Sequence, residues 1–195
     1  MPSDTSRSSA VSNALSSIRK DRRFPNKVLV GRWADYLFFE PFLIFNPDFI
    51  DVKNTLMIAE EASVIALVNL GNGIPTEHTN SQVLFIAQNT EAKEYISELE
   101  SRGSPISWRF LMDRYVCSSD KGNWSIYCEK ENDVGVFAFR EGFSQSVWSQ
   151  VEKLLKAKSI RFASSSGDTQ LFDFGKLLPS WKSVLVDEHV PIIIK

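Results

Sequence analysis

Residues 107–140 read SWRFLMDRYVCSSDKGNWSIYCEKENDVGVFAFR, and this stretch decides the fold class. Turn-forming residues at 119–122 and 130–132 separate three runs that are rich in β-branched and aromatic side chains. The first run ends near Cys117 and the second starts at Trp124. Short turns between such runs predict three strands in an antiparallel meander.

Side chains alternate between the two faces of a strand, so the faces of the second run can be assigned. Trp124, Ile126 and Cys128 share one face. Tyr127 and Glu129 share the other. Both faces thus carry a large aromatic side chain.

The register of the first hairpin predicts the state of the chain's two cysteines. If Ser118 lies opposite Asn123, Cys117 and Cys128 are roughly four residues apart along the sheet. At about 3.3 Å per residue, this separation exceeds the roughly 7 Å between Cα atoms that a disulfide allows. Both thiols are therefore expected to be free.

Outside the meander, the chain shows both strand and helix patterns. Residues 63–70 and 82–87 are near-continuous apolar runs, typical of strands in a sheet that is covered on both faces. Helical patterns occupy residues 52–62, 90–102 and 143–158, with a shorter helix around Pro179. We therefore expect one α+β domain over residues 28–195, with a mixed or antiparallel sheet and packed helices. The apolar tail at 190–194 is expected to dock on the core or a sheet edge.

Aromatic residues gather at 33–49, which holds seven of the chain's 14 Phe, 5 Trp and 4 Tyr. Pro41 and Pro47 exclude a long helix there, so short extended or helical pieces around turns are expected. Two interpretations remain open. The rings fill the core, or some of them form an exposed patch that binds a partner.

Residues 1–27 differ from the rest of the chain in composition. They carry six basic and two acidic residues, a net charge of +4, which leaves −6 for residues 28–195. The first dozen residues are rich in Ser and have few large apolar side chains, so we expect a basic, partly disordered arm. A short helix at 9–20 fits the spacing of the apolar residues. The basic cluster at 19–23 then lies at a solvated helix end, or alternatively forms a phosphate-binding arm.

The composition indicates a soluble globular protein, with 43% hydrophobic and 24% charged residues. A net charge of −2 argues against a general binder of nucleic acid or anionic membranes. Two cysteines are too few for a disulfide scaffold, and the N-terminus lacks the apolar block of a secretory signal. We therefore expect a cytoplasmic protein with no membrane or nucleic-acid partner.

Residues that carry chemistry form no catalytic or metal-binding pattern. His78 and His189 are far apart, and neither has a neighbouring Cys. Cys117 and Cys128 fall on predicted strands, where cysteine usually packs as a small apolar residue. The glycines at 71–73 lack the further residues of a nucleotide-binding loop. We expect no catalytic residue, metal or cofactor, and no enzyme activity.

Acidic residues around the meander support two interpretations. Fixed on a sheet, they neutralise a basic site on another protein and speed its capture. Held in pairs within a cleft, they act as acid and base in a small hydrolase or transferase. The first interpretation predicts a partner-binding surface with Trp124 or Tyr127 as an aromatic anchor. Its acidic members are Asp113, Asp120, Glu129, Glu131 and Asp133.

The same part of the chain carries a resemblance to a known class of proteins. Residues 113–115, 118–129 and 133–136 resemble the segment "turn, Trp-x-Ile-Tyr-x-Glu, turn, apolar strand" of small bacterial immunity proteins from contact-dependent and polymorphic toxin systems. The resemblance implies a small cytoplasmic α+β protein that binds one cognate toxin domain, often a nuclease, and blocks its active site without doing chemistry. An adaptor or scaffold domain is the alternative binding function.

Overall fold

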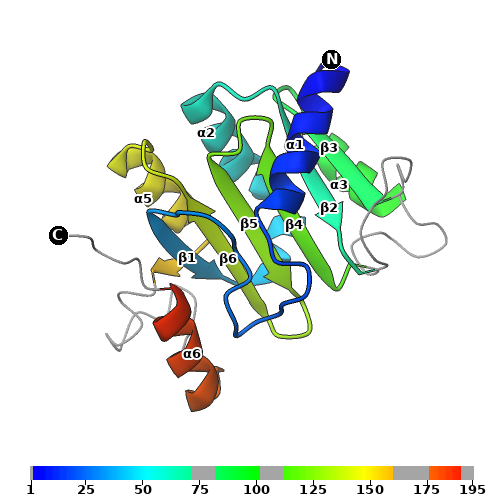
Figure 1. Ribbon diagram of the computed structural model, residues 1–195. Coiled ribbons are helices and arrows are strands. Elements are labelled where there is room, and N and C mark those ends of the chain that lie inside the picture. The colour runs from blue at the N-terminus through cyan, green and yellow to red at the C-terminus, as the bar shows by residue number, and fades with distance from the viewer. Residues whose placement is uncertain (1, 72–81, 102–111, 160–175, 190–195) are drawn as a thin grey trace.

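A seven-stranded antiparallel sheet forms the centre of the computed structural model, which describes residues 2–71, 82–101, 112–159 and 176–189 (Figure 1). The strand order is β3-β2-β4-β5-β6-β1-β7, so β3 and β7 form the two edges. The strands are β1 (Asp35–Phe39), β2 (Val64–Asn69), β3 (Val83–Ala87), β4 (Arg114–Ser119), β5 (Trp124–Glu129), β6 (Val134–Phe139) and β7 (Lys158–Ser159). The predicted meander is confirmed, because β4, β5 and β6 are antiparallel neighbours.

Helices cover both faces of this sheet (Figure 1). One face is covered by the 3-10 helix η1 (Pro41–Phe45) and by α2 (Phe49–Glu60), α3 (Ala92–Ser101) and α5 (Gln145–Leu154). The other face is covered by α1 (Asp4–Ser16) and α6 (Pro179–His189). The predicted α+β fold is therefore confirmed, with an antiparallel sheet. Among the helices of the described residues, none has the length and apolar character needed to span a membrane.

Each face of the sheet has its own hydrophobic core, and β5 contributes to both. Trp124, Ile126 and Cys128 lie in the core under α2, α3 and α5. Tyr127 lies in the core under α1 and α6. This arrangement confirms the predicted alternation along the strand.

The register between β4 and β5 is two residues away from the predicted one. Cys117 lies opposite Ile126, so the two cysteines are two residues apart along the sheet instead of four. The reason is that the backbone N–H of Asp120 donates to the carbonyl of Val64 at 3.0 Å, which keeps β4 paired with β2 and moves the turn further along the chain. Cys117 and Cys128 are nevertheless free and buried, as predicted.

The aromatic segment at 33–49 forms β1, η1 and the start of α2, so the predicted short pieces are confirmed. Six of its seven rings are buried: Trp33, Tyr36, Phe38, Phe39, Phe45 and Phe49. Phe42, in η1, is 51% exposed. The core interpretation therefore holds for six rings, and Phe42 is the one ring of this segment that lies on the surface.

The N-terminal segment corrects the expectation of a partly disordered arm at 1–27. Helix α1 starts well before the predicted helix and packs on β2 and β4. Its contact residues Ala10 and Ala14 are fully buried. Such small side chains let a helix approach a sheet closely, yet they give little apolar signal in a sequence. The helix ends at Ser16, so the basic cluster at 19–23 lies in a loop and not at a helix end.

Some predicted features lie outside the described residues. These are the tail at 190–194, most of the glycine turn at 71–73, and His78. The short helix predicted around Pro179 is α6.

Candidate functional site

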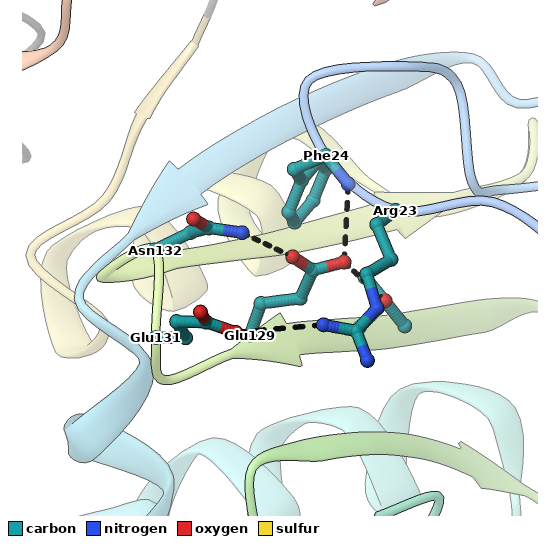
Figure 2. A network of polar contacts seen from close by, with 6 residues as sticks. Arg23, Phe24, Glu129, Glu131 and Asn132 are labelled. Atoms are coloured by element: carbon teal, nitrogen blue, oxygen red, sulfur yellow. Dashed lines mark hydrogen bonds and ion pairs between the residues drawn. The ribbon is translucent and has the colours of Figure 1, made fainter.

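A buried carboxylate, Glu129, organises one end of the sheet. It is the last residue of β5, lies on the α1 side and is 1% exposed. Its Oε1 accepts hydrogen bonds from the Tyr127 hydroxyl at 2.5 Å and from the Phe24 backbone N–H at 3.0 Å, and its Oε2 accepts one from the Asn132 amide (Figure 2). Burial and the adjacent carboxylate raise the pKa of Tyr127, which keeps its hydroxyl as a donor. These donors stabilise a carboxylate that would otherwise be costly to bury.

The Glu129 network holds the loop at 17–30 against the sheet. Two backbone hydrogen bonds of 2.7 Å close this loop at its base, from Arg19 to Val28 and from Val30 to Ser17. Near the tip, the buried Phe24 ring meets the Tyr127 ring edge-on, with the ring centres 5.3 Å apart. The loop is therefore fixed at its base and at its tip.

Fixing the loop also fixes the basic side chains that it carries. Three of them are exposed: Arg19, Lys20 and Arg23. The Arg23 guanidinium forms an ion pair with the Glu131 carboxylate at 3.4 Å, and both side chains are mostly exposed. An exposed pair of this kind contributes little to stability, so both groups can exchange it for contacts with a partner.

An exposed aromatic side chain, Phe42, lies near the turn that joins β5 to β6. The Lys130 Nζ lies over the Phe42 ring, 5.5 Å from its centre. The backbone N–H of Lys130 donates to the carbonyl of Asp113 at 2.9 Å, which joins this turn to the start of β4. Burial lowers the pKa of Lys130, and the Asp113 carboxylate opposes that effect. Aromatic side chains are enriched at protein-binding interfaces, and the rim around them is polar.

These contacts define what we call the sheet-end surface. Its side chains are Phe42, Arg23, Lys130, Asp113, Glu131 and Asp133. The surface combines acidic and basic groups with one exposed ring, which Lys130 contacts. It is therefore mixed in charge, whereas the sequence led us to expect a purely acidic surface.

The predicted contact residues divide into exposed and buried groups. Three are exposed at the ends of strands and in the turn: Asp113, Glu131 and Asp133. Three are at most 1% exposed: Trp124, Tyr127 and Glu129. This burial corrects the expectation that these three side chains contact a partner directly. The physical reason is that helices or loops cover both faces of the sheet, so a residue on either face of β5 points into a core.

Asp120 has a structural contact at the far end of β4 from Asp113. Its carboxylate accepts hydrogen bonds from the Ser63 hydroxyl at 2.7 Å and from the Ser63 backbone N–H at 3.0 Å. These bonds join the start of β2 to the end of β4. Asp120 therefore lies outside the sheet-end surface.

The predicted anchor Trp124 is hydrogen-bonded to Glu60, and the burial of Glu60 makes stability depend on pH. The Trp124 indole N–H donates to Glu60 Oε1 at 2.7 Å, and hydrogen bonds from Ser119 and Asn123 also act on this carboxyl group. Burial raises the pKa of Glu60 above its ordinary 4.5, and its hydrogen bonds only partly oppose this. The folded state thus holds this proton more tightly than the unfolded chain, so the free energy of unfolding falls as pH rises above about 4.5.

A Glu60→Gln variant is expected to lose this part of the pH dependence, because the amide keeps an acceptor for Trp124 but does not ionise. Urea unfolding at about pH 5 and about pH 8 measures the effect. The free energy of unfolding of the variant, minus that of the native protein, should therefore be larger at about pH 8 than at about pH 5. A Glu61→Gln variant at the exposed neighbouring position should follow the native protein. The same pH slope in Glu60→Gln as in the native protein would contradict this role of Glu60.

Other buried groups with chemical potential have structural contacts. Burial raises the pKa of both thiols, Cys117 and Cys128, which disfavours the thiolate form. The fully buried Lys53 donates to three backbone carbonyls. Across the described ranges, no group of three or more His, Cys, Asp or Glu side chains is placed to hold a metal ion.

Sequence patterns did not single out Phe42, Arg23 or Lys130 as contact residues. Phe42 belongs to the aromatic segment, in which the pattern does not distinguish surface rings from core rings. Arg23 lies in the basic cluster that was assigned to solvent or phosphate. Their neighbours in space are distant in sequence, so no local signal marks them.

Comparison with known proteins gives no match to a family model, to a curated protein or to a solved structure. A functional proposal therefore depends on the sheet-end surface and on the residues that resemble immunity proteins.

Proposed function

We propose that the protein is a non-enzymatic binding protein, a cytoplasmic immunity protein that neutralises a cognate toxin domain through the sheet-end surface. The observation that carries this proposal is the exposed Phe42 ring beside Lys130, at the turn that follows β5. Glu129, the last residue of β5, holds the loop that carries Arg23 against the sheet. A few aromatic anchors with a polar rim supply most of the binding energy of many interfaces. A framework that is already fixed also loses less conformational entropy on binding.

The resemblance to immunity proteins supports a toxin domain as the partner. The resembling residues, 113–115, 118–129 and 133–136, lie in β4, β5, the start of β6 and the turns beside them. Two residues of the sheet-end surface, Asp113 and Asp133, belong to these stretches, and Lys130 and Glu131 lie in the turn between two of them. The acidic members of this surface suit a basic active site such as that of a nuclease, and Arg23 and Lys130 suit acidic residues around that site.

A growth-rescue experiment tests this proposal. A toxin domain found encoded beside this gene is expressed in bacteria together with the native protein, Phe42→Ala or Ile58→Ala. Ile58 is a matched control, because it is 69% exposed on α2 and lies outside the sheet-end surface. We expect rescue by the native protein and by Ile58→Ala, and weaker rescue by Phe42→Ala.

The outcomes separate the proposal from its alternatives. Binding without rescue would indicate an adaptor or scaffold. Turnover of a small molecule by the protein alone, without rescue, would indicate an enzyme. The absence of a toxin domain beside the gene would also contradict the proposal. Equal rescue by Phe42→Ala and Ile58→Ala would show that the sheet-end surface does not bind the toxin domain.

A further inference from the structure

The edge strand β3 has main-chain groups whose direction follows from the register. On the β4 side of β2, the carbonyl of Val64 accepts from the Asp120 N–H at 3.0 Å, and the Leu70 N–H donates to the carbonyl of Arg114 at 2.8 Å. Main-chain groups alternate in direction along a strand, so the N–H and C=O of Ile65 and Leu67 point toward β3. There these two residues lie opposite Ile86 and Leu84. The N–H and C=O of Phe85, between Leu84 and Ile86, therefore point away from the sheet.

A neighbouring position shows what covers such outward groups. The N–H of Ala87 donates to Thr90 Oγ1 at 3.1 Å, and its C=O accepts from Lys53 Nζ at 3.3 Å. Within the part of the chain that is described, the outward groups of Phe85 have no such partner. An open position on an edge strand is a site at which another strand can add.

A groove of about 370 Å³ runs along this open position. Arg7 of α1 lines it on one face of the sheet, and Glu94 and Glu98 of α3 line it on the other. The Arg7 guanidinium lies over the Phe85 ring, 5.3 Å from its centre, and its buried Nε has no acceptor among the described residues. Buried donors normally have a partner, so this N–H favours an acceptor supplied by a ligand.

We propose that this groove binds an extended segment of another protein, which adds to the sheet as a strand and pairs with the main chain of Phe85. Side chains of an added strand alternate between the two faces. Those on the α1 face would be acidic and meet Arg7, and those on the α3 face would be basic and meet Glu94 and Glu98. The site shares no residue with the sheet-end surface, so the inference goes beyond the proposed function.

Charge argues against a second copy of this chain as the occupant. Two β3 strands that join antiparallel, edge to edge, are related by a twofold axis perpendicular to the sheet, so equivalent faces stay on the same side. Arg7 would then lie near its own copy, and so would Glu94 and Glu98. Like charges placed across paired strands are destabilising. A foreign strand with alternating charge avoids this repulsion.

A peptide titration tests the proposal. The probe is an end-blocked hexapeptide of alternating Glu and Lys, added to the ¹⁵N-labelled full chain. We expect the amide signal of Phe85 to shift and its hydrogen exchange to slow, because its N–H gains an acceptor. A control peptide with Thr in place of each Lys should bind at least about fivefold more weakly.

A pair of variants on α3 tests the charge pattern. Glu98→Lys should weaken binding of the Glu-Lys peptide at least about fivefold, whereas Glu100→Lys, exposed on the same helix but outside the groove, should leave it unchanged. Glu94 is retained because its charge also acts on Lys53.

Three results would overturn the proposal. The first is unchanged exchange at Phe85 with the peptide at saturation. The second is equal binding of the two peptides by the native protein, a comparison that does not depend on how any variant folds. The third is a hydrogen-exchange rate at Phe85 that falls as protein concentration rises in the absence of peptide, which would identify a second copy as the occupant.

Discussion

Replacing Glu129 with alanine is expected to lower the free energy of unfolding by about 3–4 kcal/mol. The change removes the acceptor of three donors: the Tyr127 hydroxyl, the Phe24 backbone N–H and the Asn132 amide. Each buried donor left unpaired costs about 1–3 kcal/mol, and water that enters the vacated space reduces the sum. Urea unfolding followed by tryptophan fluorescence measures the loss.

A neighbouring carboxylate supplies the control for this prediction. Glu131→Ala removes an exposed side chain two positions away and should change stability by less than about 0.5 kcal/mol. Hydrogen exchange adds a second measurement, because amides of the loop at 17–30 should exchange faster in Glu129→Ala only. If Glu129→Ala lowers the free energy of unfolding no more than Glu131→Ala does, Glu129 does not hold this loop.

Replacing Lys53 with methionine is expected to lower the free energy of unfolding by about 2–4 kcal/mol. Methionine keeps most of the apolar stem but removes the ammonium, which donates to the carbonyls of Ala87, Gln88 and Thr90 at 3.3, 2.8 and 3.0 Å. These carbonyls belong to the connection between β3 and α3, so the loss should also loosen that connection. Hydrogen bonds from a charged donor contribute about 1.5–3 kcal/mol each when nothing replaces them, and partial access to water lowers the total.

The matched control for Lys53 lies on α3. Lys93→Met makes the same chemical change at an exposed position and should stay within about 0.5 kcal/mol of the native protein. Equal stability of the two variants, measured by urea unfolding, would show that the carbonyls around Lys53 find other donors.

Local patterns predicted the parts of the fold that depend on neighbouring residues. The meander follows from turn residues spaced between apolar runs, and alternation along β5 assigns its two faces. Helix α1 was only partly predicted, because Ala10 and Ala14 make its contact with the sheet and carry little apolar signal. The register of β4 with β5 was wrong by two residues, because Asp120 pairs with Val64 across a distance that no local pattern reveals.

The candidate site was predicted where it depends on turns and missed where it depends on contacts distant in sequence. Asp113 and Glu131 are exposed because they lie beside a strand end and in a turn. Trp124 and Glu129 were expected at the surface, and this was wrong. Both are buried because the loop at 17–30 and the helices cover both faces of the sheet. Phe42 becomes part of the site only when the fold places it beside Lys130, far along the chain.

The most direct test of the central claim is a calorimetric titration of a toxin domain found encoded beside this gene with the native protein, Phe42→Ala and Ile58→Ala. A saturable complex is expected with the native protein and with Ile58→Ala. Phe42→Ala should bind at least about 30-fold more weakly, as expected for loss of an interface hot spot. Failure of the native protein to bind, or equal dissociation constants for Phe42→Ala and Ile58→Ala, would contradict the claim that the protein acts by binding a partner at the sheet-end surface.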